Sequence, residues 1–127
     1  MTDKNISILV VDDFKTMISI IVNILNQLGF KNIDTASDGQ QALDKMKVKK
    51  YDLILSDWNM EPMSGLDLLT HVRGVPITRN LPFILITAES KAENIIAAKR
   101  AGVSNYIVKP FTAETVKEKL VAVLGKF

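Results

Sequence analysis

Three aspartates stand directly after apolar segments of this sequence, at points where a strand would end. Asp12 and Asp13 follow the β-branched run Ile6–Val11, and Asp57 closes the apolar run that begins at Leu53. In an open parallel sheet, ligands bind in the crevice beyond the carboxyl ends of the strands. We therefore expect the three carboxylates to meet at one edge of a sheet.

Two other polar side chains occupy equivalent positions. Thr87 ends the apolar segment Pro82–Thr87, and Lys109 follows the segment Asn105–Val108. At the same sheet edge they would add a hydroxyl donor and a positive charge to the carboxylates.

This combination of groups suits the transfer of a phosphoryl group. Carboxylates that share one crevice repel one another and raise each other's pKa, and a divalent cation relieves that cost. An acidic, oxygen-rich site is one that Mg²⁺ prefers. Aspartate can act as a nucleophile toward phosphorus, and phosphoryl transfer depends mainly on positioning and charge neutralisation, which Mg²⁺ and Lys109 would supply. We therefore predict that Asp57 accepts a phosphoryl group and that the protein is a switch.

Segments of two kinds alternate along the chain and would position these residues. Continuous apolar runs are typical of strands that are covered on both faces. They predict strands at Ile6–Val11, Asn32–Ala36, Leu53–Asp57, Pro82–Thr87 and Asn105–Val108. The second of these is mixed in polarity, so we expect it at a sheet edge.

Apolar residues recur at three- and four-residue steps between the predicted strands, which indicates helices. The first apolar stripe runs from Phe14 to Leu28, and Gly29 would end that helix. The other helices are predicted to start near Asp38, Ser64, Ser90 and Thr112. Such alternation implies right-handed βαβ crossovers with helices on both faces of the sheet. We predict an α/β fold, a flavodoxin-like (βα)5 doubly wound parallel five-stranded sheet with strand order 2-1-3-4-5.

The composition suits one compact cytoplasmic domain. The 127 residues are 47% hydrophobic and 24% charged, with a net charge of +2 and no cysteine. This length predicts one domain over residues 1–127, with no output domain. The basic residues are too scattered to indicate nucleic acid, and no apolar run reaches the ~18 residues that a membrane span needs. We expect no nucleic-acid or membrane partner, and nothing demands more than a monomer.

Five separated motifs stand out along the chain: Val11–Asp13, Ser56–Met60, Thr87–Glu89, Glu93–Ala98 and Tyr106–Phe111. Together they resemble the receiver domain of two-component response regulators, and more narrowly the single-domain regulators of chemotaxis. The resemblance extends over nearly the whole chain. A lone Asp-Asp pair would mean little, but the five motifs together are highly specific.

The resemblance implies a role for each residue at the predicted sheet edge. Asp57 would be the phosphoacceptor, in a self-catalysed transfer followed by autodephosphorylation, so the protein would not be an enzyme in the usual sense. Asp13, Asp57 and the backbone carbonyl of Asn59 would hold Mg²⁺, and Asp12 would assist through water. Lys109 would pair with the phosphoryl group.

The resemblance also implies a switch. Thr87 would move to hydrogen-bond the phosphoryl group, and Tyr106 would swing into the space vacated near Thr87. Asn59 and Glu89 match positions that tune how fast the phosphoryl group is lost. The partner-binding face would include Lys91, Ile95, Tyr106, Val108 and Lys119.

The implied partners are a chemotaxis-type histidine kinase as phosphodonor and the flagellar motor switch protein as target, and a phosphatase remains open. A phosphate sink or a single-domain regulator outside chemotaxis also remains open. The chain departs from the family pattern at Glu61-Pro62, where the proline comes one residue late, and at Ser64, where an acidic residue is common. Lys109-Pro110 matches the family's cis peptide.

Two alternatives from other classes are less well supported. An Asp-nucleophile phosphohydrolase of the haloacid-dehalogenase type would need an Asp-x-Asp pair after the first strand, whereas Asp12 and Asp13 are adjacent. A flavodoxin-like flavin binder would need a phosphate loop rich in Ser, Thr or Gly there, and the acidic pair would repel phosphate.

Overall fold

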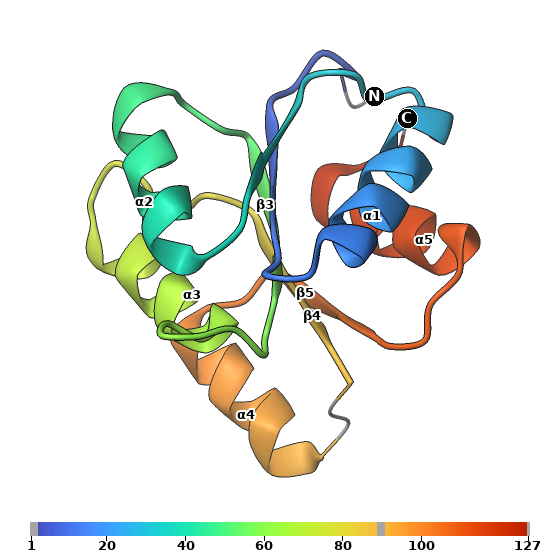
Figure 1. The fold of residues 1–127 in the computed structure, drawn as a ribbon. Coiled ribbons are helices and arrows are strands. Elements are labelled where there is room, and N and C mark those ends of the chain that lie inside the picture. Colours follow the sequence, from blue (N-terminus) through green and yellow to red (C-terminus); the bar gives the residue numbers. More distant parts are fainter. Residues whose placement is uncertain (1–2, 89–90, 127) are drawn as a thin grey trace.

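The computed structural model describes residues 3–88 and 91–126, in which strands and helices alternate as predicted (Figure 1). The strands are β1 (Ile8–Val11), β2 (Ile33–Ala36), β3 (Leu53–Asp57), β4 (Phe83–Thr87) and β5 (Asn105–Val108). The helices are α1 (Lys15–Gln27), α2 (Gly39–Val48), α3 (Gly65–Gly74), α4 (Ala92–Ala101) and α5 (Ala113–Leu124). Among the described residues, none of the helices is both long enough and apolar enough to span a bilayer.

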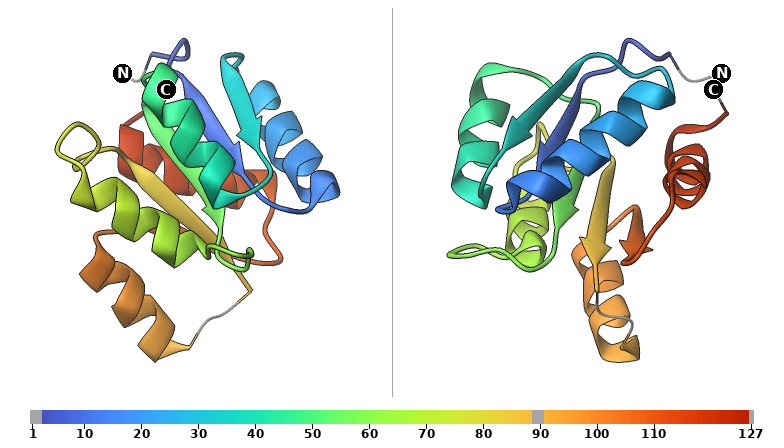
Figure 2. Two further views of the ribbon diagram at one scale, coloured as in Figure 1. Left: turned by 60° about the vertical axis from the view of Figure 1, so that its left-hand side comes forward. Right: turned by 45° about the vertical axis from the view of Figure 1, so that its right-hand side comes forward.

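The five strands form one sheet in the order β2-β1-β3-β4-β5, and every neighbouring pair is parallel. The predicted fold class is therefore confirmed, including the edge position of β2. Helices α1 and α5 cover one face of the sheet, and α2, α3 and α4 cover the other (Figures 1 and 2). The strand order reverses between β1 and β3, and the crevice at such a reversal is where ligands bind in open α/β sheets.

Alternate residues of the central strands face opposite sides of the sheet. Ile8 and Val10 of β1 pack in the core that contains residues of α1 and α5. Leu9 and Val11 pack in the core that contains residues of α2, α3 and α4. All four side chains have 0% exposure. Because both faces are buried, the strands read as continuous apolar runs.

Side chains at the helix starts satisfy backbone N–H groups that have no partner within the helix. The Asp38 carboxylate accepts a hydrogen bond from Gln41 N at 2.8 Å, at the start of α2. Ser64 and Asp67 form a reciprocal capping box at the start of α3. Lys91 takes the N-cap position of α4 without a side-chain cap, and the predicted start at Ser90 lies outside the described residues.

The predicted apolar stripe of α1 was wrong at its first residue. Phe14 precedes the helix, and its side chain is 59% exposed. The Phe14 N–H donates to Asp12 Oδ1 at 3.0 Å, so this residue belongs to the turn that leaves the sheet. The prediction is confirmed further along the stripe at Ile21 and Leu25, which are the buried residues of α1.

Candidate functional site

The register of the sheet brings Asp12 and Asp57 together. Val11 of β1 is paired with Ser56 of β3, so the next residue on each strand lies at the same edge. The Asp12 N–H donates to Ala36 O at 3.1 Å, which extends the pairing of β1 with β2 by one residue. The two carboxylates therefore occupy neighbouring strand ends at the point where the strand order reverses.

The same edge receives Thr87 and Lys109 from β4 and β5. Asp57 is paired with Ile86, the residue before Thr87. The Lys109 N–H donates to Thr87 O at 2.8 Å, immediately beyond the last β4–β5 pair. The structure thus brings together all five residues that follow or end the predicted strands.

The three aspartates form a compact acidic cluster. One carboxylate oxygen from each of Asp12, Asp13 and Asp57 lies within 4.8 Å of the other two. Asp12 and Asp57 are buried, with 1% and 4% exposure, whereas Asp13 is exposed. A cation could therefore approach from the Asp13 side and contact oxygens of the two buried carboxylates.

The Asp12 carboxylate carries a large electrostatic cost, because it is buried. Burial, opposed by the hydrogen bond from Phe14 N, raises the pKa of Asp12 from 3.8 to about 6. The charge of Asp57 raises this pKa further, but by less than burial does. The predicted repulsion between carboxylates therefore does raise the pKa of Asp12, but it is the smaller of the two causes. The larger one is desolvation.

The oxygens of the cluster suit a hard divalent cation. Asp12 Oδ2 is buried and has no hydrogen-bond partner among the described residues. Buried polar atoms are seldom left without a partner. A carboxylate oxygen in this position, next to two further carboxylates, is a donor set of the kind that Mg²⁺ takes. The residues present therefore fit the predicted metal ion.

Lys109 supplies the positive charge at this edge. Its Nζ lies 2.7 Å from Asp57 Oδ1, and the two side chains are 26% and 5% exposed. A charge-assisted hydrogen bond of this length is among the stronger side-chain interactions. The arrangement places a nucleophilic carboxylate, a counter-charge and further acceptor oxygens in one crevice.

Three of the four residues predicted to act after phosphorylation fall within the described residues. Thr87 is 3% exposed at the end of β4. Asn59 is exposed in the loop that follows Asp57, whereas Glu89 lies outside the described residues. Tyr106 of β5 is half-buried, and Lys119 Nζ lies 5.2 Å from the centre of its ring.

The other members of the predicted partner face lie on α4 and β5 or next to them. Lys91 precedes α4, Ile95 lies on α4 and Val108 ends β5. Lys91 is exposed, and the other two are partly buried.

Both Lys109-Pro110 and Glu61-Pro62 are cis peptides, of which only the first matches the prediction.

Two residues beneath Asp57 were not identified from the sequence. The Ser56 hydroxyl is fully buried and donates to Asp57 O at 3.0 Å. Gly65 begins α3, and a Cβ at this position would collide with Asp57 O and lie 2.9 Å from Trp58 Cα. The Ser-Gly pair at a predicted helix start was the only sequence signal for this close approach.

Comparisons with known proteins agree with this geometry. The family model for the response regulator receiver domain matches residues 8–121. Chemotaxis protein CheY-3 of Vibrio cholerae is 52% identical over 118 residues, which cover 93% of this chain and 91% of that protein.

Solved structures give the same result. Chemotaxis response regulator CheY4 of Vibrio cholerae superposes with a TM-score of 0.88 at 32% identity, over 94% of this chain and 99% of that one. The receiver domain of the sensor histidine kinase PA1611 from Pseudomonas aeruginosa, solved with a magnesium ion coordinated in its active site cleft, gives a TM-score of 0.85 at 26% identity. The match covers 96% of this chain and 99% of that one.

Proposed function

This chain belongs to the response regulator receiver family, and from that membership we propose that it is a signalling switch operated by phosphorylation of Asp57. Receiver domains are signalling proteins and not metabolic enzymes. The observation that carries the proposal is the 2.7 Å ion pair between Lys109 Nζ and Asp57 Oδ1, beside the cluster of three carboxylates. It places a nucleophilic oxygen next to the charge that its phosphorylated form requires.

Asp57 attacks the phosphorus of a phosphohistidine on a histidine kinase. A carboxylate oxygen forms the new O–P bond, the P–N bond breaks, and the imidazole nitrogen keeps the electron pair and takes up a proton. Lys109 pairs with the transferred phosphoryl oxygens and offsets their charge. Attack by water on the aspartyl phosphate later returns the carboxylate and releases inorganic phosphate, without a separate enzyme.

Asp12, Asp13, Asp57 and the backbone carbonyl of Asn59 are the groups that would hold Mg²⁺. When bound, Mg²⁺ supplies the remaining charge neutralisation at the transferred group. Support comes from the unpartnered Asp12 Oδ2 and from the magnesium ion in the active site cleft of the PA1611 receiver domain. Asn59 follows β3 and Glu89 follows β4 in the sequence, and we expect the two to set how readily water reaches the phosphoryl group.

Phosphorylation is read out through β5 and its neighbours. Thr87 turns its hydroxyl toward the phosphoryl group, and Tyr106 moves inward beside it. The surface of α4, β5 and α5 changes with that movement, at Lys91, Ile95, Tyr106, Val108 and Lys119. The ring of Tyr106 lies under the Lys119 ammonium, so its inward movement also releases that contact.

The 52% identity to a chemotaxis protein favours a role in chemotaxis. We assign a chemotaxis-type histidine kinase as phosphodonor and the flagellar motor switch protein as target, in the cytoplasm. The receiver domain acts through contact with its partner protein. A phosphate sink would share the site but would not bind the motor.

The first test follows Trp58 fluorescence during titration with Mg²⁺ and then with beryllofluoride or acetyl phosphate. Trp58 is the only tryptophan and adjoins Asp57, so it reports both events. We expect a response to the phosphodonor that requires Mg²⁺ and is absent in Asp57→Asn. A response that persists in Asp57→Asn would exclude Asp57 as the acceptor.

A second test separates a motor regulator from a phosphate sink. Binding to purified flagellar motor switch protein is measured with and without beryllofluoride. Activation is expected to raise the affinity, and Lys119→Glu is expected to lower it. Unchanged, weak binding in both states would reject the motor as target while leaving the phosphorylation site intact.

A further inference from the structure

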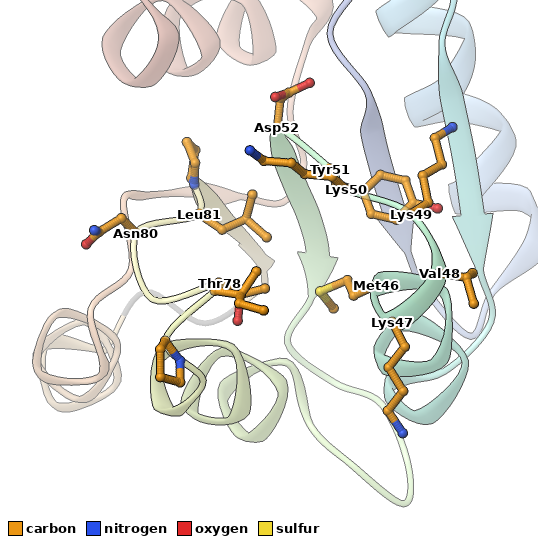
Figure 3. A pocket seen from close by; sticks show the side chains of 13 residues that line it. Met46, Lys47, Val48, Lys49, Lys50, Tyr51, Asp52, Thr78, Asn80 and Leu81 are labelled. Atoms are coloured by element: carbon orange, nitrogen blue, oxygen red, sulfur yellow. The ribbon is translucent and has the colours of Figure 1, made fainter.

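A hollow lies at the opposite end of the sheet from Asp57. Its volume is about 670 Å³, within the range of protein binding sites. Residues 46–52, where α2 leads into β3, form one side, and most of residues 76–82, where α3 leads into β4, form the other (Figure 3). β3 runs from this end to the phosphoacceptor, which is the last of its five residues, over a length of roughly 15 Å. The hollow is therefore separate from the site described above.

The floor and rim of the hollow are largely apolar. Figure 3 shows the side chains of Met46 and Leu81 approaching each other from the two sides, and both are only partly buried. Val48 and Ile77, which also line the hollow, are 86% and 90% exposed. These are the two largest exposed fractions among the large apolar side chains of the described residues. Exposed apolar surface gathered around a concavity is typical of interaction sites.

The charge around the hollow is positive. Its lining contains Lys47, Lys49 and Lys50 but one acidic residue, Asp52. The Asp52 carboxylate already accepts a hydrogen bond from Ser7 N at 2.8 Å.

The three lysines differ in whether they form ion pairs with acidic residues of this chain. Lys49 is bound to Asp34 at 2.9 Å. Lys47 lies 3.8 Å from Asp44, and both side chains are mostly exposed, so this pair is weak. Lys50 is exposed, and within the part of the chain that the structure describes its ammonium makes no ion pair. Lys50 and Lys47 therefore remain available to an acidic partner.

We propose that this hollow docks an acidic, amphipathic segment of a partner protein. Apolar side chains of the segment insert between Met46 and Leu81 and cover Ile77, and its carboxylates face Lys50 and Lys47. The exposed apolar rim suits a peptide segment that covers it, and the excess of lysines selects a negative one. Because the hollow shares no residue with the acidic cluster or with α4, β5 and α5, the partner stays bound in both phosphorylation states. The hollow would hold the protein on its partner whether or not Asp57 is phosphorylated.

The test selects short peptides from a displayed random library on the whole protein, after depletion on the Lys50→Glu, Ile77→Lys double variant. Both substituted side chains are exposed, so the variant is expected to fold, and an unchanged thermal melt checks this. We expect the enriched peptides to be net negative with spaced Leu, Ile or Phe residues. In NMR titrations they should shift the amide signals of residues 46–52 and 76–82.

Point variants make the result quantitative. Lys50→Glu is expected to weaken peptide binding about tenfold, and added salt should weaken wild-type binding. Lys117→Glu, a reversal of an exposed lysine on α5, is the matched control and should leave the affinity unchanged. Beryllofluoride should change the affinity by less than about twofold, because the two ends of the sheet act separately.

Four outcomes would overturn the proposal. Peptides could fail to be enriched over the depleted background, or the enriched peptides could be neutral or basic. Shifts confined to α4, β5 and α5 would place the peptides elsewhere. Self-association of the protein that is abolished by Ile77→Lys would assign the hollow to a second copy of this chain.

Discussion

Lys109 Nζ lies 2.7 Å from Asp57 Oδ1, although the strands that precede these residues are not neighbours in the sheet. β4 lies between β3 and β5, so the lysine reaches across the end of β4, where Thr87 stands. The pair thus links the end of β3 to the end of β5 across β4. A change in the charge at Asp57 acts directly on Lys109, which lies three residues beyond Tyr106. This connection gives phosphorylation a short route to the α4, β5 and α5 surface.

Lys109→Ala should separate phosphoryl transfer from metal binding. We expect phosphorylation by acetyl phosphate to slow by about a hundredfold, because a positioned positive charge at the transferred oxygens is lost. Mg²⁺ affinity should be unchanged or higher, since the ammonium no longer neutralises Asp57. Both quantities are measured by Trp58 fluorescence. A parallel loss of Mg²⁺ affinity would show that Lys109 acts by holding the site together.

Asp12→Asn should stabilise the protein when Mg²⁺ is removed by a chelator. The Asp12 carboxylate is 1% exposed, and its Oδ2 has no partner among the described residues. Replacing a desolvated charge by a neutral amide is expected to raise the free energy of unfolding by about 1–3 kcal/mol. Urea unfolding with chelator measures this gain.

The same variant should bind Mg²⁺ more weakly, so excess Mg²⁺ should reverse the order of stability. Asp13→Asn is the matched control, because Asp13 is exposed. It should weaken Mg²⁺ binding without stabilising the metal-free protein. Equal effects of the two substitutions on metal-free stability would contradict desolvation of Asp12 as the cause.

Gly65→Ala should disturb the phosphoacceptor. The added Cβ would collide with Asp57 O and lie 2.8 Å from Leu85 Cδ2, so the start of α3 has to move. We expect a loss of about 1–3 kcal/mol in the free energy of unfolding, as for other overpacked sites, and slower phosphorylation. Thermal unfolding and the rate of the Trp58 response measure the two effects.

The other end of α3 offers the control for this change. A Cβ at Gly74 would meet nothing within 4 Å. Gly74→Ala should be neutral or raise stability by up to about 1 kcal/mol, with phosphorylation unchanged. If both alanine variants behave alike, the close contact at Gly65 has no special importance.

Tyr51→Phe should lower stability without affecting the switch. The Tyr51 hydroxyl donates to Asp34 Oδ2 at 2.7 Å, on the edge of the sheet away from Asp57. Loss of this hydrogen bond is expected to cost about 1 kcal/mol, because Asp34 is partly exposed to water. Urea unfolding measures the cost, and an unchanged Trp58 response to beryllofluoride serves as the internal control.

The same hydrogen bond predicts a dependence on alkaline pH. Burial and the hydrogen bond to Asp34 raise the pKa of Tyr51 from 10.0 to about 12. The folded protein therefore holds this proton more tightly than the unfolded chain does, so the stabilisation is complete below pH 10 and is lost as the pH rises toward 12. Wild-type stability should fall in that interval, and Tyr51→Phe should remove this part of the fall. Parallel pH profiles of the two proteins would refute the assignment.

Much of the fold could be predicted because strands buried on both faces leave an unmistakable apolar run, as in Leu53–Leu55. The candidate site followed from chemistry at the ends of those runs, and the parallel sheet brings Asp12, Asp57 and Lys109 together. Interactions between segments distant in sequence could not be predicted in this way. The hydrogen bond of Tyr51 to Asp34 joins two elements whose spacing carries no local signal.

Which groups would reach one edge of the sheet could be predicted, because the type of residue at each strand end is a local property. The differences among those groups depend on tertiary packing. Asp12 is buried and Asp13 is exposed, although they are adjacent, because Asp12 still continues the β1 pairing while Asp13 lies in the turn toward α1. The absence of a Cβ at Gly65 likewise matters only because α3 packs on the carbonyl of Asp57. Burial, and with it the cost of each charge, is set by packing that no single segment encodes.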